Sequence, residues 1–153
     1  MKGWYSRGYL PHFDQACVLQ GVTFRLHDSL PQEAVDQMAS AAGLELDSSK
    51  RARIEELMNA GYGACYLRIP ALALLVENAL LHFDGDGYRL LAWVIMPNHV
   101  YVLIEQVEGH PLGKVGQSWK SSTAHQANKL LSRSGLFWAR DYFDRYIRNQ
   151  EHL

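Results

Sequence analysis

The chain of 153 residues has the length of one ordinary domain, and its 48% hydrophobic content is enough to bury a core. No apolar run reaches the roughly 18 residues of a membrane span, and the N-terminus lacks the apolar centre of a secretion signal. We therefore expect a single cytoplasmic domain over residues 1–153. Cys17 and Cys65 are far apart and outside any CxxC spacing, which favours buried thiols over a zinc site or a disulfide framework.

Charge is distributed unevenly along the chain. Overall, 15 Lys and Arg residues and 16 Asp and Glu residues give a formal charge of −1. Residues 113–153, however, hold seven basic side chains against three acidic ones, together with several aromatic residues. This composition is typical of a surface that contacts phosphates and stacks bases. Ordinary amphipathic helices with solvated basic faces would give the same composition, and the segment alone does not separate the two interpretations.

The first half of the chain alternates strand and helix signals. Residues 22–26 alternate apolar and polar side chains, which predicts a strand that extends back towards residue 17. Capping and proline signals predict a helix from about 31 to 42 and a second helix from about 48 to 61. Residues 65–68 are expected to form a short strand or connector. Pro70 then opens a strongly apolar helix to residue 83, which we expect to pack against a sheet.

The second half contains the clearest strands. Residues 88–96 and 99–105 are β-rich and are interrupted by Pro97 and Asn98, so we predict an antiparallel pair of central strands joined at a turn or bulge. A helix is expected over 112–131, followed by an aromatic and basic segment over 137–153. Without repeats or linkers, the natural architecture is an α/β sandwich of antiparallel strands backed by helices.

His99 and Tyr101 are the residues of these strands whose side chains could bind a metal ion or take part in catalysis. Side chains alternate along a strand, so both point to the same face, away from Val100 and Val102. Two histidines at this spacing would suit one divalent ion. A phenol, with a reference pKa near 10 against about 6.5 for imidazole, is a poor substitute at neutral pH. Taken by itself, His99 is more often a structural or capping residue than a metal ligand.

The segment AWVIMPNHVYVLIE at 92–105 resembles the AWVVMPNHVHVLIE segment of the REP-associated tyrosine transposases, the single-tyrosine branch of the HUH nucleases. Four further blocks resemble family segments and occur in family order. They are RGYLPHFD at 7–14, VTFRLHDSLP at 22–31, WKSSTAHQANKLL at 119–131 and FWARDYFDRYIRNQEHL at 137–153. Together the blocks cover nearly the whole chain, and the ordered combination is more specific than any one of them.

This resemblance implies a ferredoxin-like α/β domain, usually a homodimer, that binds hairpin or single-stranded DNA of the REP type. In the family a tyrosine attacks the scissile phosphate and forms a 5′-phosphotyrosine link, while Mg or Mn held by two histidines polarises that phosphate. By resemblance, His99 is assigned as the remaining metal ligand and His99 and Tyr101 as the catalytic positions. We expect both to face a pocket lined by cationic C-terminal helices.

The chain departs from the family pattern at two points. Tyr101 replaces the second histidine, and the sequence ends at Leu153, before the family's helix with the nucleophilic tyrosine. We therefore expect a C-terminally truncated domain with weakened metal binding and impaired cleavage. Tyr142 and Tyr146 match family tyrosines that the resemblance assigns to the fold and the DNA side, and Tyr101 as the nucleophile would lack a second metal ligand to orient the phosphate.

The expected DNA contacts come mostly from the C-terminal quarter. Basic side chains would contact phosphates, an aromatic ring would stack an unpaired base, and the N-terminal block would add two contacts or simply anchor the terminus. The residues assigned to DNA binding are Arg7, His12, Lys114, Lys120, Arg133, Trp138, Arg140, Tyr142, Arg145 and Arg148. For the aromatic residues of this segment, among them Trp119, Phe137, Trp138 and Phe143, a core position is the stronger expectation.

Three functions stay open at this point. The first is a transposase-family protein that binds structured single-stranded DNA but cleaves it poorly. The second is an active nuclease that uses another tyrosine. The third is a structural or interaction domain that has lost DNA binding.

Overall fold

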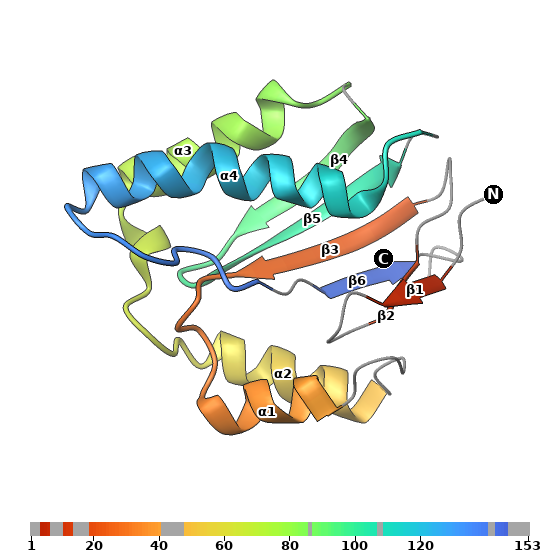
Figure 1. Ribbon diagram of the computed structural model, residues 1–153, viewed down its shortest axis with the longest axis horizontal. Coiled ribbons are helices and arrows are strands. Elements are labelled where there is room, and N and C mark those ends of the chain that lie inside the picture. Colours follow the sequence, from red (N-terminus) through yellow and green to blue (C-terminus); the bar gives the residue numbers. More distant parts are fainter. Residues whose placement is uncertain are drawn as a thin grey trace.

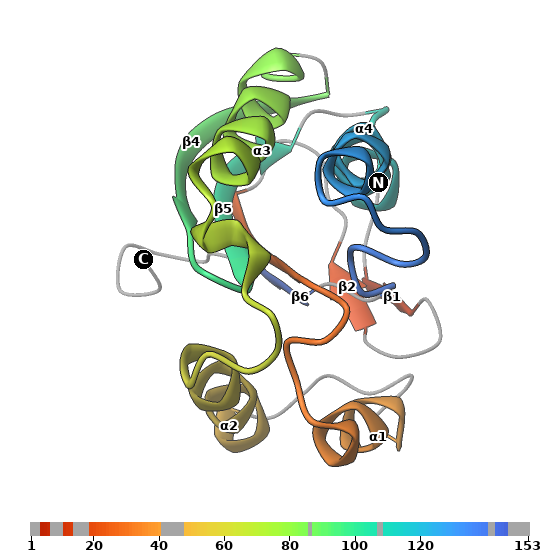
Figure 2. The same cartoon turned by 90° about the vertical axis from the view of Figure 1, so that its left-hand side faces the viewer.

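The computed structural model describes residues 4–6, 11–13, 19–40, 48–85, 87–106, 109–140 and 143–146. The main body is a four-stranded antiparallel sheet in the order β4-β5-β3-β6. Its strands are β3 (Leu19–Arg25), β4 (Tyr88–Ile95), β5 (His99–Gln106) and β6 (Phe143–Tyr146). Helices α3 (Pro70–His82) and α4 (Leu112–Leu130) lie together over one face of this sheet (Figures 1 and 2).

The connection of these elements confirms the ferredoxin-like class. Along the chain, β3, α3, β4, β5, α4 and β6 follow one another as a β-α-β-β-α-β unit. Two helices, α1 (Gln32–Ser40) and α2 (Ser48–Asn59), are inserted between β3 and α3 and lie on the side of the sheet away from α3 and α4 (Figure 1). Near the N-terminus, β1 (Trp4–Ser6) and β2 (Pro11–Phe13) form a separate antiparallel pair.

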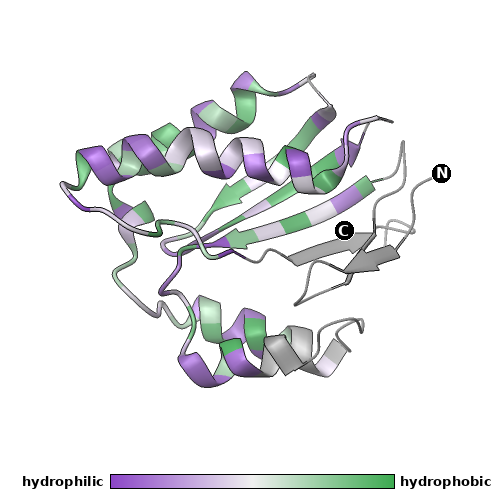
Figure 3. Ribbon diagram, viewed as in Figure 1, coloured by the Kyte–Doolittle hydropathy of each residue, from purple (hydrophilic) through white to green (hydrophobic). Residues whose placement is uncertain are grey.

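The core lies between the sheet and the α3–α4 layer because alternate residues of β5 are apolar. Val100, Val102 and Ile104 are fully buried and belong to one cluster with Trp119 of α4. Phe24 of β3 stacks against Trp119 with ring centroids 5.6 Å apart. In Figure 3 the hydrophilic residues of α4 stand out on its outer side, as expected for a helix that covers a core.

Buried hydrogen bonds tie the helices to the sheet. Trp119 Nε1 donates to Tyr88 Oη at 2.8 Å, and that hydroxyl donates to the Leu80 carbonyl at 2.7 Å. Trp138 Nε1 donates to Thr123 Oγ1 at 2.7 Å. Each large polar aromatic residue of the core therefore has a partner, which removes the cost of burying its N–H or O–H group.

Most predicted elements are confirmed. The strand at 22–26, both helices of the first half, the apolar helix after Pro70, the β4–β5 pair and the long helix from residue 112 are all present. Pro97 and Asn98 form the β4–β5 turn, where Met96 N donates to the His99 carbonyl at 2.9 Å. The bulge lies elsewhere, at Leu91 in β4.

The apolar helix α3 packs against the sheet as expected, and its other face is exposed, with Leu74 56% exposed. Three details differ from the expectation. Tyr66–Arg68 forms a 3₁₀ turn rather than a strand. β4 is an edge strand, not a central one, because only β5 pairs with it among the described residues. The C-terminal segment contributes the strand β6, which pairs with β3.

No helix in the described part of the chain is both long enough and apolar enough to cross a membrane.

Candidate nucleic-acid interface

His99 and Tyr101 lie on the face of the sheet that α3 and α4 do not cover. In the antiparallel register His99 is opposite Arg25 and Tyr101 is opposite Thr23. Their shared face, inferred from strand alternation, is confirmed by burial, since Val100 and Val102 point into the core on the opposite side. The expectation that cationic C-terminal helices face this pair is wrong. α4 packs on the Val100 side because that side carries the apolar side chains.

His99 is held in a buried polar surrounding at one end of the sheet. Its side chain is 7% exposed, and Nδ1 lies 2.8 Å from Asn98 Oδ1. Asn98 Nδ2 in turn donates to the carbonyls of Met58 and Tyr62, both at 3.1 Å. Because the amide oxygen only accepts, this geometry makes Nδ1 the protonated nitrogen and leaves the lone pair on Nε2. Burial lowers the pKa of His99 below its usual 6.5, so the neutral form is favoured.

Tyr101 points away from His99. A Cβ atom placed on Gly21 would lie 2.8 Å from Tyr101 Oη, so the phenol ring extends across β3 above Gly21. Gly21 is four residues from Arg25, the strand partner of His99. At about 3.3 Å per residue, the two backbone positions are roughly 13 Å apart. In this arrangement the phenol oxygen and the His99 ring do not share one ligand position.

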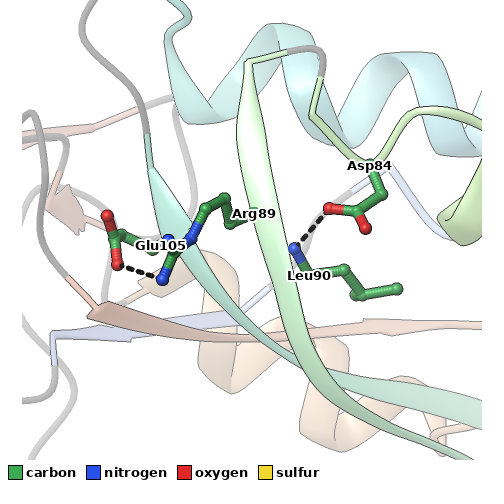
Figure 4. Close-up of polar contacts among 4 residues, drawn as sticks. All are labelled: Asp84, Arg89, Leu90 and Glu105. Atoms are coloured by element: carbon green, nitrogen blue, oxygen red, sulfur yellow. Dashed lines mark hydrogen bonds and ion pairs between the residues drawn. The ribbon is translucent and has the colours of Figure 1, made fainter.

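The remaining polar groups of this face do not complete a metal site. Arg89 of β4 and Glu105 of β5 are strand partners joined by an ion pair of 3.3 Å (Figure 4). Figure 4 also shows the Asp84 carboxylate, which accepts a hydrogen bond from the Leu90 N–H. Among the described residues, no three His, Cys, Asp or Glu side chains are placed to share an ion. The described residues therefore do not fit the Mg or Mn site implied by the resemblance.

A second candidate site is a groove between α4 and residues 135–140. Its volume is about 390 Å³. We call it the α4 groove. One wall consists of residues on α4, and the opposite wall is the segment that leads from Gly135 to Arg140. The lining residues are Gly113, Gly116, Gln117, Lys120, Ser121, Ala124, Gly135, Leu136, Phe137, Trp138, Ala139 and Arg140.

The two walls of the α4 groove are held together by hydrogen bonds. Lys120 Nζ donates to the Ala139 carbonyl at 2.8 Å. Ala139 N donates to the Arg25 carbonyl at 2.9 Å, which attaches the second wall to the sheet. Arg133 fixes the turn after α4 by donating to the Leu136 carbonyl and by lying 5.6 Å from the Tyr66 ring centroid. The groove is therefore a fixed feature of the fold.

The α4 groove is formed by a segment of the chain in which basic residues are concentrated. Residues 112–140 contain five basic residues and no acidic one, although the whole chain has a net charge of −1. Lys120 and Arg140 line the groove, and Arg140 is exposed. Lys114 is exposed on α4. Such a concentration of one sign of charge attracts an anionic ligand.

The structure brings together some of the residues assigned to DNA binding and separates others. Lys120, Trp138 and Arg140 line the groove, with Lys114 on the same helix, whereas Arg133 is engaged in the turn. The Trp138 ring is 4% exposed and lies in the core, so it is not available for base stacking in this conformation. The core position expected for Trp119 and Phe137 is confirmed.

Five assigned residues are not located by their side chains. His12 lies in β2, and Arg145 lies in β6 opposite Gly21 in the register. The side chains of both lie outside the described part of the structure, as do Arg7, Tyr142 and Arg148 in full. Their role in DNA binding remains an expectation.

The sequence did not lead us to predict that Gly113, Gly116, Gln117 and Ser121 line a groove. Two glycines three residues apart, Gly113 and Gly116, interrupt an otherwise good helix sequence. Glycine inside a helix costs about 0.8–1.0 kcal/mol relative to alanine, so the pair was an available signal for a helix surface kept free of side chains.

Comparison with solved structures identifies proteins of similar fold. One is a REP-associated tyrosine transposase bound to a REP hairpin, with a TM-score of 0.55 and 13% identity, over 92% of this chain and 62% of that one. Another is a candidate transposase from Deinococcus radiodurans R1, with a TM-score of 0.47 and 13% identity, over 97% of this chain and 88% of that one. No family model and no curated protein matches the chain. The chain thus spans 62% of the hairpin-bound transposase and has the same fold as that protein.

Proposed function

We propose that this protein binds hairpin or single-stranded DNA as a transposase-like domain in which metal-assisted strand cleavage is impaired. The observation that carries the proposal is the α4 groove, a cationic groove on a ferredoxin-like fold formed by a segment without acidic residues. The fold likeness supports the choice of ligand, since the solved structure with a TM-score of 0.55 is a transposase bound to a REP hairpin.

Binding would follow from counterion release. Lys114 and Lys120 on α4 and Arg140 on the opposite wall supply positive charge, and each phosphate that they neutralise releases condensed counterions. Of these, Arg140 and Lys114 are exposed and need no rearrangement to reach a phosphate. A sequence-independent contribution of this kind positions the strand, while unpaired bases provide selectivity.

Impaired cleavage is proposed from the geometry of His99 and Tyr101. The phenol lies over Gly21 and the imidazole is buried beside Asn98, so the two side chains do not converge on one ion that would polarise a scissile phosphate. We also propose a homodimer, from the family resemblance, and a single cytoplasmic domain, from the length and the distribution of apolar residues in the sequence.

The test is binding of a labelled REP-type hairpin with a single-stranded tail, followed by fluorescence anisotropy over a series of salt concentrations. We expect log K to fall linearly with log salt. Arg140→Gln should reduce the slope by about 0.7–0.9, the contribution of one phosphate contact. Arg53→Gln is the matched control, because Arg53 is an exposed arginine on α2, far along the chain from the groove.

Two outcomes separate the alternatives. If the protein does not bind the hairpin at low salt, where electrostatic attraction is strongest, the DNA-binding proposal is wrong and a structural or interaction domain is favoured. If incubation with Mg or Mn gives a protein–DNA adduct that survives denaturant, the impaired-cleavage part is wrong and an active nuclease using another tyrosine is favoured.

A further inference from the structure

The α4 groove has the size and polarity of a small-molecule pocket, not only of a charged surface. Its volume of about 390 Å³ lies within the range of about 300–1,000 Å³ that is typical of ligand pockets. A nucleotide belongs to the class of ligands that such pockets hold. Mere phosphate contacts on a helix surface would not require a hollow of this size.

The lining of the groove divides into an apolar and a polar part. Leu136, which is 51% exposed, and Ala124 offer apolar surface. Gln117 and Ser121 are exposed on neighbouring turns of α4. The Gln117 amide can donate and accept hydrogen bonds, and the Ser121 hydroxyl, which donates to the Gln117 carbonyl at 2.6 Å, can accept one. Lys120 and Arg140 contribute positive charge. A flat, partly apolar base with hydrogen-bonding edges and an attached phosphate matches all three kinds of lining residue.

Gly116 leaves open space in the α4 wall of the groove. It lies inside α4, and a Cβ atom placed on it would have no heavy atom within 4 Å. Packing within the protein therefore does not require a glycine here, although glycine weakens the helix. The free space above the backbone is the part of the groove that a larger side chain would fill.

We propose that the α4 groove binds one unpaired nucleotide, with the base against Leu136, Ala124 and the Gly116 backbone and with the phosphate near Lys120 and Arg140. This inference rests on the proposed DNA-binding function and deepens it, because it assigns an unpaired base to a particular pocket. The nucleotide comes either from a DNA strand or from free nucleotide in solution, and both have the same chemistry.

The experiment uses hairpin oligonucleotides with 2-aminopurine at one unpaired position at a time. A base in the pocket should be shielded from quenching by acrylamide, and at one position only. Gly116→Leu should remove that shielding and weaken binding of the hairpin at least fivefold, since losing the contacts of one base costs about 5- to 150-fold in affinity. Gln126→Leu is the matched control, because it adds a leucine to the exposed surface of α4 outside the groove.

The arms of the experiment distinguish the outcomes. Replacing the shielded nucleotide by an abasic site should weaken binding to the native protein but not to Gly116→Leu. A circular dichroism spectrum of Gly116→Leu is recorded beside that of the native protein to check that the variant folds. The contrary result is that Gly116→Leu binds the hairpin and shields the 2-aminopurine base as the native protein does, while Arg140→Gln still lowers the salt slope. That result overturns the pocket proposal and leaves the DNA-binding proposal standing. Saturable binding of a free nucleoside monophosphate that Gly116→Leu abolishes, without any binding of the oligonucleotide, supports the pocket and overturns the DNA-binding proposal.

Discussion

At position 101 a phenol replaces the imidazole that the family resemblance implies, and this substitution provides a direct test of the metal argument. Tyr101→His shortens the side chain, so that the new imidazole no longer extends across Gly21 and lies on the same face as His99. Imidazole also binds divalent ions without first losing a tightly held proton. We expect the affinity for Mn²⁺ to rise at least about tenfold, or about 1.4 kcal/mol, measured by isothermal titration calorimetry.

Tyr101→Phe is the control for this prediction, because it removes the hydroxyl without adding a ligand. It should leave the Mn²⁺ affinity at the level of the native protein. Equal affinities for the native protein and for Tyr101→His would show that positions 99 and 101 do not form a paired ligand site.

The buried state of His99 makes stability depend on pH. Its pKa is lowered in the folded protein by burial, so the unfolded chain binds a proton more readily than the folded one. This contribution is fully present above the unfolded value of 6.5 and is lost as the pH falls below it. We expect the free energy of unfolding in urea to decrease from pH 7 to pH 5, and His99→Gln to flatten that part of the profile. An unchanged profile in His99→Gln would mean that other groups cause the dependence.

At the residue scale, the sequence predicted which residues share a face but not how each is surrounded. The alternation of side chains along β5 was sufficient to predict that His99 and Tyr101 lie on the same face of the sheet. The hydrogen bonds from Asn98 to Met58 and Tyr62 were not predictable, because those partners lie 40 and 36 residues earlier in the chain. Nor was the position of the Tyr101 ring, which depends on the absence of a side chain at Gly21 on a neighbouring strand.

At the scale of elements, α4 carries a cost that a single substitution should remove. Gly116 is inside this 19-residue helix, and a methyl group at its Cβ would enter open space. We expect Gly116→Ala to raise the free energy of unfolding by about 0.5–1 kcal/mol, measured by chemical denaturation with an unchanged m-value. As a matched control, Ser118→Ala on the same helix should have a smaller effect, since serine already has a Cβ atom. Destabilisation by Gly116→Ala would show that the groove wall does not tolerate even a methyl group.

The elements that were predicted best are those with a strong local signal. β4 and β5 have continuous β-rich sequences around a Pro-Asn turn, and α4 has apolar residues at helical spacing. β6 was not predicted as a strand, because its backbone partners are in β3, more than 100 residues earlier. The 3₁₀ turn at Tyr66–Arg68 was assigned as a strand or connector because three residues contain too little periodicity to separate the two.

For the whole molecule, the described residues form two hydrophobic clusters rather than one. The larger cluster lies between the sheet and the α3–α4 layer. The smaller cluster, between α1 and α2, consists of Leu30, Ala34, Ile54 and Met58, with Val35 and Leu57 packed against it. A polar contact joins α2 to the sheet, since Asn98 Nδ2, in the β4–β5 turn, donates to the Met58 carbonyl at 3.1 Å. A separate small cluster with polar attachments is expected to open more easily than the main core.

Met58→Ala tests whether the α1–α2 pair opens as its own unit. Met58 is 2% exposed, and truncating a buried methionine costs about 2–5 kcal/mol. If the pair opens independently, hydrogen exchange measured by mass spectrometry should accelerate in α1 and α2, by at least about 30-fold for 2 kcal/mol. The amides of β3 and β5 should change little, because their exchange depends on the larger cluster. Val102→Ala in that cluster should instead accelerate exchange in the strands and in α1–α2 alike, since the pair is attached to the end of the sheet. Equal acceleration throughout the described residues in Met58→Ala would mean that both clusters open together.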